Sequence, residues 1–229
     1  MRWVADGIAV DGAHAPLLQP TSFGLQSGQV QLAAGLPGEG HTALALVAGG
    51  RMRADRGLVQ LDGNAATAPL RRAVAIVDTP GVSEPDGPLR LATVVGEELA
   101  MARRPTGRRA VSEWLAEHDA SEHAATRLED VPGHVRLRLL AELAAARPGV
   151  RALVMTVPDR HGGDPRWWWE LACGHAMRGT AVLVTCLDIS AQLLGVRPAV
   201  IGAADPGDPV TVAADPEDES VVHEGQDQA

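Results

Sequence analysis

A glycine-rich segment around residue 40 most constrains what this chain can fold into. Residues 35–42, GLPGEGHT, match the phosphate-loop pattern G-x-x-x-x-G-K-[ST], except that His41 replaces the lysine. An apolar run at 30–34 precedes the segment and helix-forming residues at 43–48 follow it, which is the context that the pattern requires. Glycines let successive backbone N–H groups point into one concavity, and a helix N-terminus adds positive potential. The segment therefore predicts an anion-binding loop between a buried strand and a helix.

Six residues of this loop are the candidate nucleotide-binding residues: Gly35, Gly38, Glu39, Gly40, His41 and Thr42. The hydroxyl group of Thr42 is also a candidate ligand for a Mg²⁺ ion that accompanies the phosphates. His41 supplies positive charge only when it is protonated, whereas a lysine would carry a fixed charge to the outer phosphates. We therefore expect weak nucleotide binding that depends on pH.

Composition and charge exclude several classes of protein. No apolar run in the 229 residues reaches the length of a transmembrane helix, and no signal peptide is expected at the N-terminus. Cys173 and Cys186 have no metal-binding spacing, which fits a reducing, cytoplasmic setting. Eight acidic residues lie beyond residue 204, so we expect an acidic tail at 204–229 that either binds a partner or keeps the chain soluble. The rest of the chain has no basic stripe, which argues against nucleic acid as a partner.

Short apolar runs and helical patterns alternate along most of the chain. Three runs predict buried strands, at 74–77, 152–155 and 181–185. Four segments predict helices, at 93–102, 111–125, 135–146 and 167–177. This alternation is typical of an α/β sheet with helices on both faces. Looser strand patterns at 4–10 and 58–61 predict a β-rich N-terminal part.

A second pattern follows the helix after the glycine loop. Residues 50–63, GRMRADRGLVQLDG, have the cadence G-x-x-x-P-x-x-G-x-h-x-h-x-G, with Ala54 where proline is usual. Over roughly residues 3–200, these motifs and their order resemble the ATP-binding cassette (ABC) ATPase subunits of transporters. The resemblance implies a P-loop NTPase fold for residues 1–203. It also implies a helical subdomain at about 83–147, which docks on a membrane partner in that family.

The resemblance assigns roles to two residues outside the loop. Members of the family stack an aromatic side chain on adenine, and His14 holds the corresponding place here. They also carry a glutamine that contacts magnesium, directly after the strand that corresponds to 74–77. Asp78 stands there, and it is either a Mg²⁺ ligand or a turn residue that ends the strand.

The family signature L-S-G-G-Q, which contacts the γ-phosphate of ATP on the opposite subunit, is replaced in this chain. Its counterpart is the segment 130–134, DVPGH. Val131 offers no hydroxyl group and Pro132 has no backbone N–H to donate, so that only Gly133 remains. The resemblance therefore predicts that this segment does not contact phosphate.

The catalytic residues of the family are also replaced. An aspartate that holds magnesium and a glutamate that polarises the attacking water correspond here to Thr156 and Val157. Asp159 would reach the catalytic position only through a bulge at Pro158. The histidine that contacts the γ-phosphate corresponds to Cys186, whose thiol is a weak donor. No residue is therefore predicted to be catalytic.

We expect an ABC-type ATP-binding subunit that takes ATP and Mg²⁺ and whose hydrolysis is impaired. The resemblance implies a membrane permease as partner, at the inner face of the cell membrane, and pairing with itself or with another ABC ATPase. One alternative is a soluble pseudo-ATPase that acts as a regulatory or structural binding module. Another is a hydrolase with rearranged catalytic residues. The three tryptophans at 167–169 predict either a core with a hydrophobic patch or a docking point.

Overall fold

The computed structural model describes residues 1–38 and 40–212, so that Glu39 and most of the predicted acidic tail lie outside the described residues. The strands are β1 (Arg2–Val10), β2 (Leu18–Gln26), β3 (Gln29–Gly35), β4 (Arg56–Leu61), β5 (Val74–Val77), β6 (Ala152–Thr156), β7 (Ala181–Leu187), β8 (Ala199–Val200) and β9 (Val210–Thr211). The helices are α1 (Gly40–Ala48), α2 (Thr67–Ala73), α3 (Leu91–Met101), α4 (Arg108–Glu117), α5 (Gly133–Ala145), α6 (Arg166–Met177) and α7 (Asp188–Leu194). None of these helices combines the length and the apolar character needed to span a membrane.

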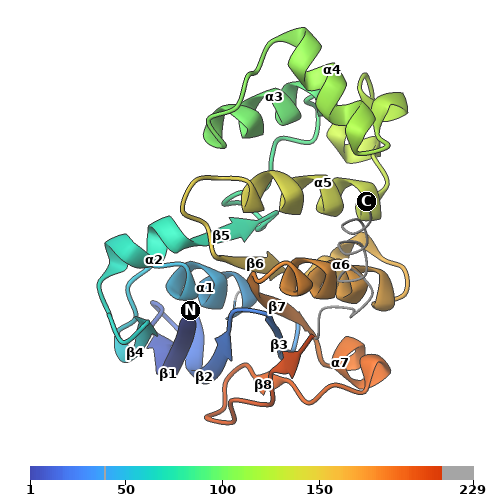
Figure 1. The fold of residues 1–229 in the computed structure, drawn as a ribbon. Helices are drawn as coiled ribbons and strands as arrows, with labels where there is room; N and C mark the ends of the chain where they lie inside the picture. Colours follow the sequence, from blue (N-terminus) through green and yellow to red (C-terminus); the bar gives the residue numbers. More distant parts are fainter. Residues whose placement is uncertain (39, 213–229) are drawn as a thin grey trace, which may run out of the picture.

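A central sheet with the strand order β5-β6-β7-β3-β8 organises the molecule (Figure 1). These strands are parallel, and β9 adds an antiparallel pairing to β3 beyond residue 203. Every residue of β5 and β6 is buried, because helices cover both faces of the sheet and leave no face for polar side chains. The predicted strands at 74–77, 152–155 and 181–185 and the α/β fold class are therefore confirmed.

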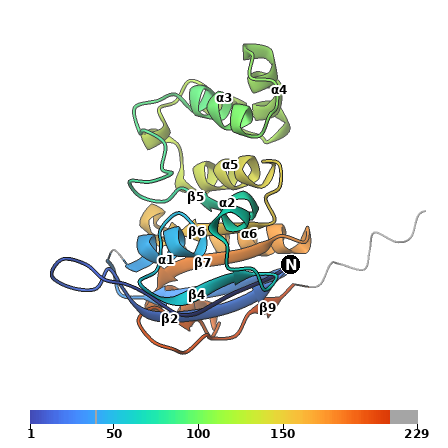
Figure 2. The same cartoon turned by 90° about the vertical axis from the view of Figure 1, so that its left-hand side faces the viewer.

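Two hydrophobic cores lie on opposite faces of the central sheet. Leu32 and Met155 pack on the side of α5 and α6, whereas their neighbours Ala33 and Val154 pack on the side of α1. The second core also includes the antiparallel sheet β2-β1-β4, so that α1 lies between the two sheets (Figure 2). This arrangement is the predicted β-rich N-terminal part.

The helical part of the chain projects from one end of the molecule, where α3 and α4 lie beyond α5 (Figure 2). Helix α4 is amphipathic and buries Val111, Trp114 and Leu115. The predicted helix at 111–125 is too long, because α4 ends at Glu117 and Asp119 adopts a left-handed backbone conformation with φ 48°. A short 3₁₀ turn at Ser121–His123 follows.

Candidate functional site

The glycine loop and the ends of β6 and β7 meet at the carboxyl edge of the central sheet. Parallel strands end together at one such edge, and α/β proteins usually bind their ligands there. A cavity of about 440 Å³ occupies this position. Its walls consist of Pro37, Gly38, His41, Thr42, Pro80, Val157, Asp159, Arg160 and Leu187.

Glycine is required in the loop partly by close packing. A Cβ atom on Gly35 would lie 2.9 Å from Cβ of Ile201, and one on Gly40 would lie 3.3 Å from its Cγ2. Gly38 lines the cavity. The three predicted glycines therefore have different positions: Gly38 faces the site, while Gly35 and Gly40 let the loop approach Ile201. Thr42, in the first turn of α1, is half-buried and lines the same cavity.

His41 is buried beneath the loop, with only 2% of its surface exposed. Its Nε2 lies 3.0 Å from the carbonyl oxygen of Leu36. Because a carbonyl only accepts, Nε2 carries the proton and the neutral ring leaves Nδ1 as an acceptor. No described residue offers Nδ1 a hydrogen-bond partner. Burial lowers the pKa of His41 more than the Leu36 carbonyl and the nearby Asp159 and Asp188 raise it, so the imidazole supplies no charge to the loop at neutral pH.

Asp78, the predicted magnesium ligand, is instead part of a buried ion-pair network. Its Oδ1 lies 2.6 Å from Nη2 of Arg136, and its Oδ2 lies 2.7 Å from Nη2 of Arg160 and 2.8 Å from Nε2 of His161. Glu84 adds an ion pair of 3.1 Å to Arg136. Burial raises the pKa of Asp78, but the hydrogen bonds from His161 and Arg136 and the charges of Arg160 and Arg136 lower it to about 2.

The end of β6 carries no group that could polarise water. The hydroxyl groups of Thr156 and Thr79 lie 2.9 Å apart, and both residues are buried. Val157 has φ 45°, a left-handed conformation that is strained for a β-branched residue. Its N–H donates to the backbone and side-chain oxygens of Thr185, at 2.9 and 3.1 Å. This bend, rather than a bulge, carries the chain into the 3₁₀ turn Pro158–His161.

Two residues of that turn, Asp159 and Arg160, line the cavity. Asp159 accepts a hydrogen bond from the backbone N–H of Leu187, at 3.2 Å, and another from the hydroxyl group of Ser190. The sequence predicts for Asp159 only the role of a displaced catalytic residue, and it predicts no role for Arg160. No sequence signal marks Arg160, because its role depends on partners that are distant in the sequence.

The remaining predicted residues lie close to the loop or are structural. His14 is exposed in a hollow of about 430 Å³ that also includes Gly40, so it lies beside the start of α1. A Cβ atom on Gly133 would meet His161 at 2.5 Å, so that this glycine serves packing. Burial is the largest cause that raises the pKa of the Cys186 thiol, which keeps it neutral. Trp168 is buried in the core while its two neighbours are partly buried against it.

The predicted Mg²⁺ site does not fit the donors that the structure brings together. Thr42 offers a hydroxyl group, but both oxygens of Asp78 already face Arg136, Arg160 and His161. Thr156 replaces a carboxylate at the end of β6 and is occupied by Thr79. Within residues 1–38 and 40–212, no cluster of three or more His, Cys, Asp or Glu side chains could hold a metal ion. Among the described residues of the cavity walls, only Thr42 and Asp159 offer side-chain oxygen atoms to a Mg²⁺ ion, and Asp159 already accepts hydrogen bonds from Ser190 and the N–H of Leu187.

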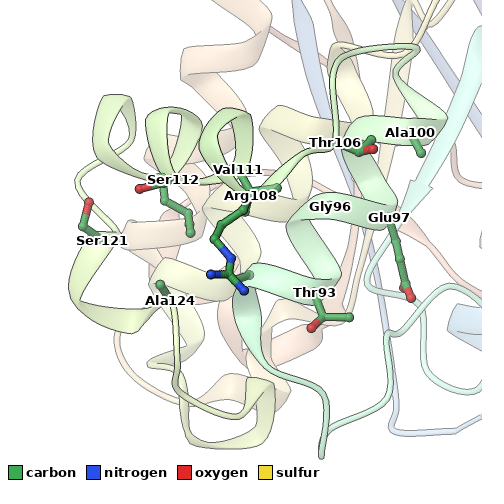
Figure 3. A pocket seen from close by; sticks show the side chains of 12 residues that line it. Thr93, Gly96, Glu97, Ala100, Thr106, Arg108, Val111, Ser112, Ser121 and Ala124 are labelled. Atoms are coloured by element: carbon green, nitrogen blue, oxygen red, sulfur yellow. The ribbon is translucent and has the colours of Figure 1, made fainter.

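A larger cavity, of about 670 Å³, lies between α3 and α4 in the helical part. Figure 3 shows Arg108, from α4, with its guanidinium group extending into the hollow between the two helices. Ala92, Gly96, Val111 and Leu115 contribute apolar surface to its walls. This cavity belongs to the region that resembles the helical subdomain of ABC ATPases.

Comparison with known proteins supports the fold. No protein-family model and no curated protein matches the chain in sequence. The ATP-binding subunit of an ABC transporter superposes with a TM-score of 0.63 at 14% identity, covering 93% of this chain and 90% of that one. A nucleotide-free ATP-binding cassette from an ABC transporter superposes with a TM-score of 0.62 at 16% identity, covering 91% of this chain and 92% of that one. Another ATP-binding cassette of an ABC transporter, in its ADP conformation, superposes with a TM-score of 0.63 at 18% identity, covering 88% of this chain and 87% of that one. The chain therefore has the P-loop NTPase fold of the ATP-binding cassettes of ABC transporters.

Proposed function

We propose that the chain is an ABC-type nucleotide-binding subunit that binds ATP weakly and hydrolyses it slowly or not at all. The observation that carries the proposal is the cavity at the carboxyl edge of the sheet. Gly38, His41 and Thr42 of the glycine loop line it, and the one carboxylate among its described walls, Asp159, already accepts hydrogen bonds from Ser190 and the N–H of Leu187.

Phosphate binding depends mainly on backbone groups. The N–H groups in the first turn of α1 have no partners within the helix, and the helix dipole places positive potential there. Thr42 adds a hydroxyl group at the same point. Nδ1 of His41 is a buried, unpaired acceptor, so a bound phosphate would favour its protonation and turn it into a charged donor. Binding should therefore take up a proton and tighten as the pH falls.

Hydrolysis requires side chains that the structure does not provide. Val157 cannot orient water, and Thr156 is hydrogen-bonded to Thr79. Asp159 faces the cavity, but its two oxygens are occupied by Ser190 and the N–H of Leu187. Because phosphoryl transfer depends on positioned charges around the phosphate, their loss removes most of the catalytic effect.

Calorimetric titration with ATP at pH 6 and pH 8 tests the binding function. We expect detectable binding that is a few times tighter at pH 6, because His41 gains its proton more readily there. The double variant His41→Ala, Thr42→Ala is the control: it should bind ATP more weakly than the wild type and with the same affinity at the two pH values. Tight binding of equal strength at the two pH values would exclude the role given to His41.

An ATPase assay tests the loss of hydrolysis. Turnover by the wild-type protein should not exceed that of the same double variant. Turnover clearly above this control would instead favour the hydrolase with rearranged catalytic residues, and Asp159→Asn would then identify the base.

The partner is the second part of the proposal. The three similar structures are parts of ABC transporters, which supports a membrane permease as partner, pairing with a second ATPase subunit and a position at the inner face of the cell membrane. Co-purification with a membrane protein would support this assignment. A purely soluble complex would favour the alternative, a pseudo-ATPase that acts as a regulatory or structural binding module.

A further inference from the structure

The cavity that lost its lysine contains another cation. Arg160 lies on the turn Pro158–His161, after β6, and lines the cavity together with His41 and Thr42 of α1. It is the only lysine or arginine in the walls of that cavity. The charge that the phosphate-loop pattern places on the loop is therefore available here from a different element.

The contacts of Arg160 leave part of its guanidinium group unused. Nη2 lies 2.7 Å from Oδ2 of Asp78 and 3.5 Å from Oε1 of Glu84, without good alignment for a hydrogen bond. Nη1 is buried and has no hydrogen-bond partner in the part of the chain that the structure describes. An unpaired buried donor is unfavourable, and an anion in the cavity would satisfy it.

Asp78 and Glu84 together hold this arginine in place. The carboxylate of Asp78 also pairs with Arg136 and His161, so its charge is shared among three neighbours. The side chain of Arg160 is 21% exposed, whereas that of Asp78 is 1% exposed. Both terminal nitrogens of the guanidinium group are buried, and Arg160 forms part of the cavity wall.

Nδ1 of His41 is a second unpaired polar atom in the same cavity. It belongs to α1, whereas Arg160 belongs to the turn after β6, so the two groups approach the cavity from different elements. The side chain of His41 is almost completely buried, with 2% exposed. Nη1 of Arg160 is a donor, and Nδ1 of His41 becomes one when the ring is protonated, so the two groups beside a glycine loop favour an anionic ligand over an apolar one.

The poor fit of a Mg²⁺ ion to this site has the same cause. Asp78 would be one of its ligands, but it pairs with Arg160 instead. An arginine that binds phosphate oxygens directly supplies charge and parallel N–H donors without a metal ion.

We propose that Arg160 binds the outer phosphates of the nucleotide and replaces both the loop lysine and the Mg²⁺ ion. The ligand is then a metal-free nucleoside di- or triphosphate. This inference rests on the proposed function, because it assumes that the glycine loop binds a phosphate chain.

Titration calorimetry of the full chain tests it with three probes: ATP, AMP and inorganic pyrophosphate. Each titration is done with excess MgCl₂ and again with EDTA. We expect Arg160→Gln to weaken the binding of ATP and pyrophosphate at least tenfold and to change the binding of AMP less than twofold. Arg166→Gln is the matched control, because Arg166 lies six residues away, is exposed and pairs only with Asp164. It should leave all three affinities unchanged.

Arg160→Lys separates charge from geometry. It keeps the charge but loses the planar fork, so its affinity for pyrophosphate should lie between those of the wild type and Arg160→Gln. Equal affinities of the wild type and Arg160→Gln for ATP and pyrophosphate would overturn the proposal.

The comparison of titrations in MgCl₂ and in EDTA uses the wild-type protein, so it tests the proposal even if Arg160→Gln does not fold. Wild-type affinity for ATP should be no higher in MgCl₂ than in EDTA. A gain of tenfold or more with MgCl₂ would overturn the proposal. A protein that binds pyrophosphate but does not bind ATP would support the anion-binding role of Arg160 and refute the nucleotide-binding function. A protein that binds neither probe would refute both proposals.

Discussion

Two regions at the same edge of the central sheet have diverged in different ways. The glycine loop, residues 35–42, keeps its strand–loop–helix geometry although its lysine is replaced by His41. The ends of β5 and β6 lie at the same edge, separated from β3 by β7, and there Asp78 and Thr156 are held by other side chains. The first region has the strand–loop–helix arrangement of an anion-binding loop, whereas the side chains of the second are paired with one another.

The difference follows from what each task requires. An anion nest is made of backbone N–H groups and a helix N-terminus, so it survives the loss of a side chain. Water activation needs a free carboxylate at one position, and a single replacement removes it. At the strand ends of this chain, Asp78 joins Arg136 of α5 to Arg160 and His161 of the turn after β6.

The largest effect that we expect concerns this ion-pair network. Asp78→Ala should lower the free energy of unfolding by about 3–5 kcal/mol, because it leaves Arg136 and Arg160 without their buried partner. Urea denaturation followed by circular dichroism measures the change. Asp11→Ala is the control, since Asp11 pairs with Arg56 at the surface and should contribute at most about 1 kcal/mol. If the two variants lose similar stability, the strand ends are not held by the network.

The sequence predicts the glycine loop and the central strands well. The runs at 74–77, 152–155 and 181–185 are short and almost entirely apolar, and only strands covered on both faces favour such runs. Their order also predicts which edge of the sheet holds the loop. Helices α2 and α7 have seven residues each, which is too short to show a helical period, and they were not predicted.

The candidate site is less predictable for a physical reason. Asp78 and Arg136 are 58 residues apart, and Asp78 and His161 are 83 apart. No local pattern connects them, so from the sequence Asp78 is either a metal ligand or a turn residue that ends the strand. Arg160 could not be identified either, since its position depends on the left-handed turn at Val157.

The two regions should also respond to acid at different pH values. The pKa of Asp78 is lowered from 3.8 to about 2. The ionised carboxylate therefore adds about 2 kcal/mol to the free energy of unfolding above pH 3.8, and this stabilisation is lost as the pH falls toward 2. The pKa of His41 is lowered from 6.5 by burial. Below pH 6.5, His41 is therefore protonated in the unfolded chain but stays neutral in the folded one. The free energy of unfolding falls as the pH decreases below 6.5.

Denaturation curves between about pH 7 and pH 3 separate these contributions. His41→Gln should reduce the loss of stability between about pH 7 and pH 5, and Asp78→Asn should reduce the loss below about pH 4. His175 also has a lowered pKa, of about 4, mainly because it is buried. The variant His175→Gln therefore shows how much of the loss of stability comes from His175. If His41→Gln leaves the upper part of the profile unchanged, the histidine is not buried in its neutral form.

Restoring the loop lysine tests whether the two regions are independent. His41→Lys should bind ATP about tenfold more tightly, because it adds a fixed charge, which corresponds to about 1.4 kcal/mol. Turnover should stay at the background level, since the strand ends still lack a free carboxylate. His134→Lys, on the exposed surface of α5, makes the same charge change away from the cavity and should not alter the affinity. Hydrolysis by His41→Lys would show that one substitution alone disabled the site.

The smallest effect concerns the backbone at the end of β6. Val157 has φ 45°, and a left-handed conformation costs a β-branched residue about 1–3 kcal/mol. Val157→Gly removes this strain but adds about 0.5–1 kcal/mol of backbone entropy, so the variant should be more stable by about 1 kcal/mol. Val82→Gly is the control, because Val82 has no positive φ and loses stability when it is replaced. A loss in both variants would mean that Val157 is held by its side-chain contacts, and the turn that presents Arg160 would then depend on valine itself.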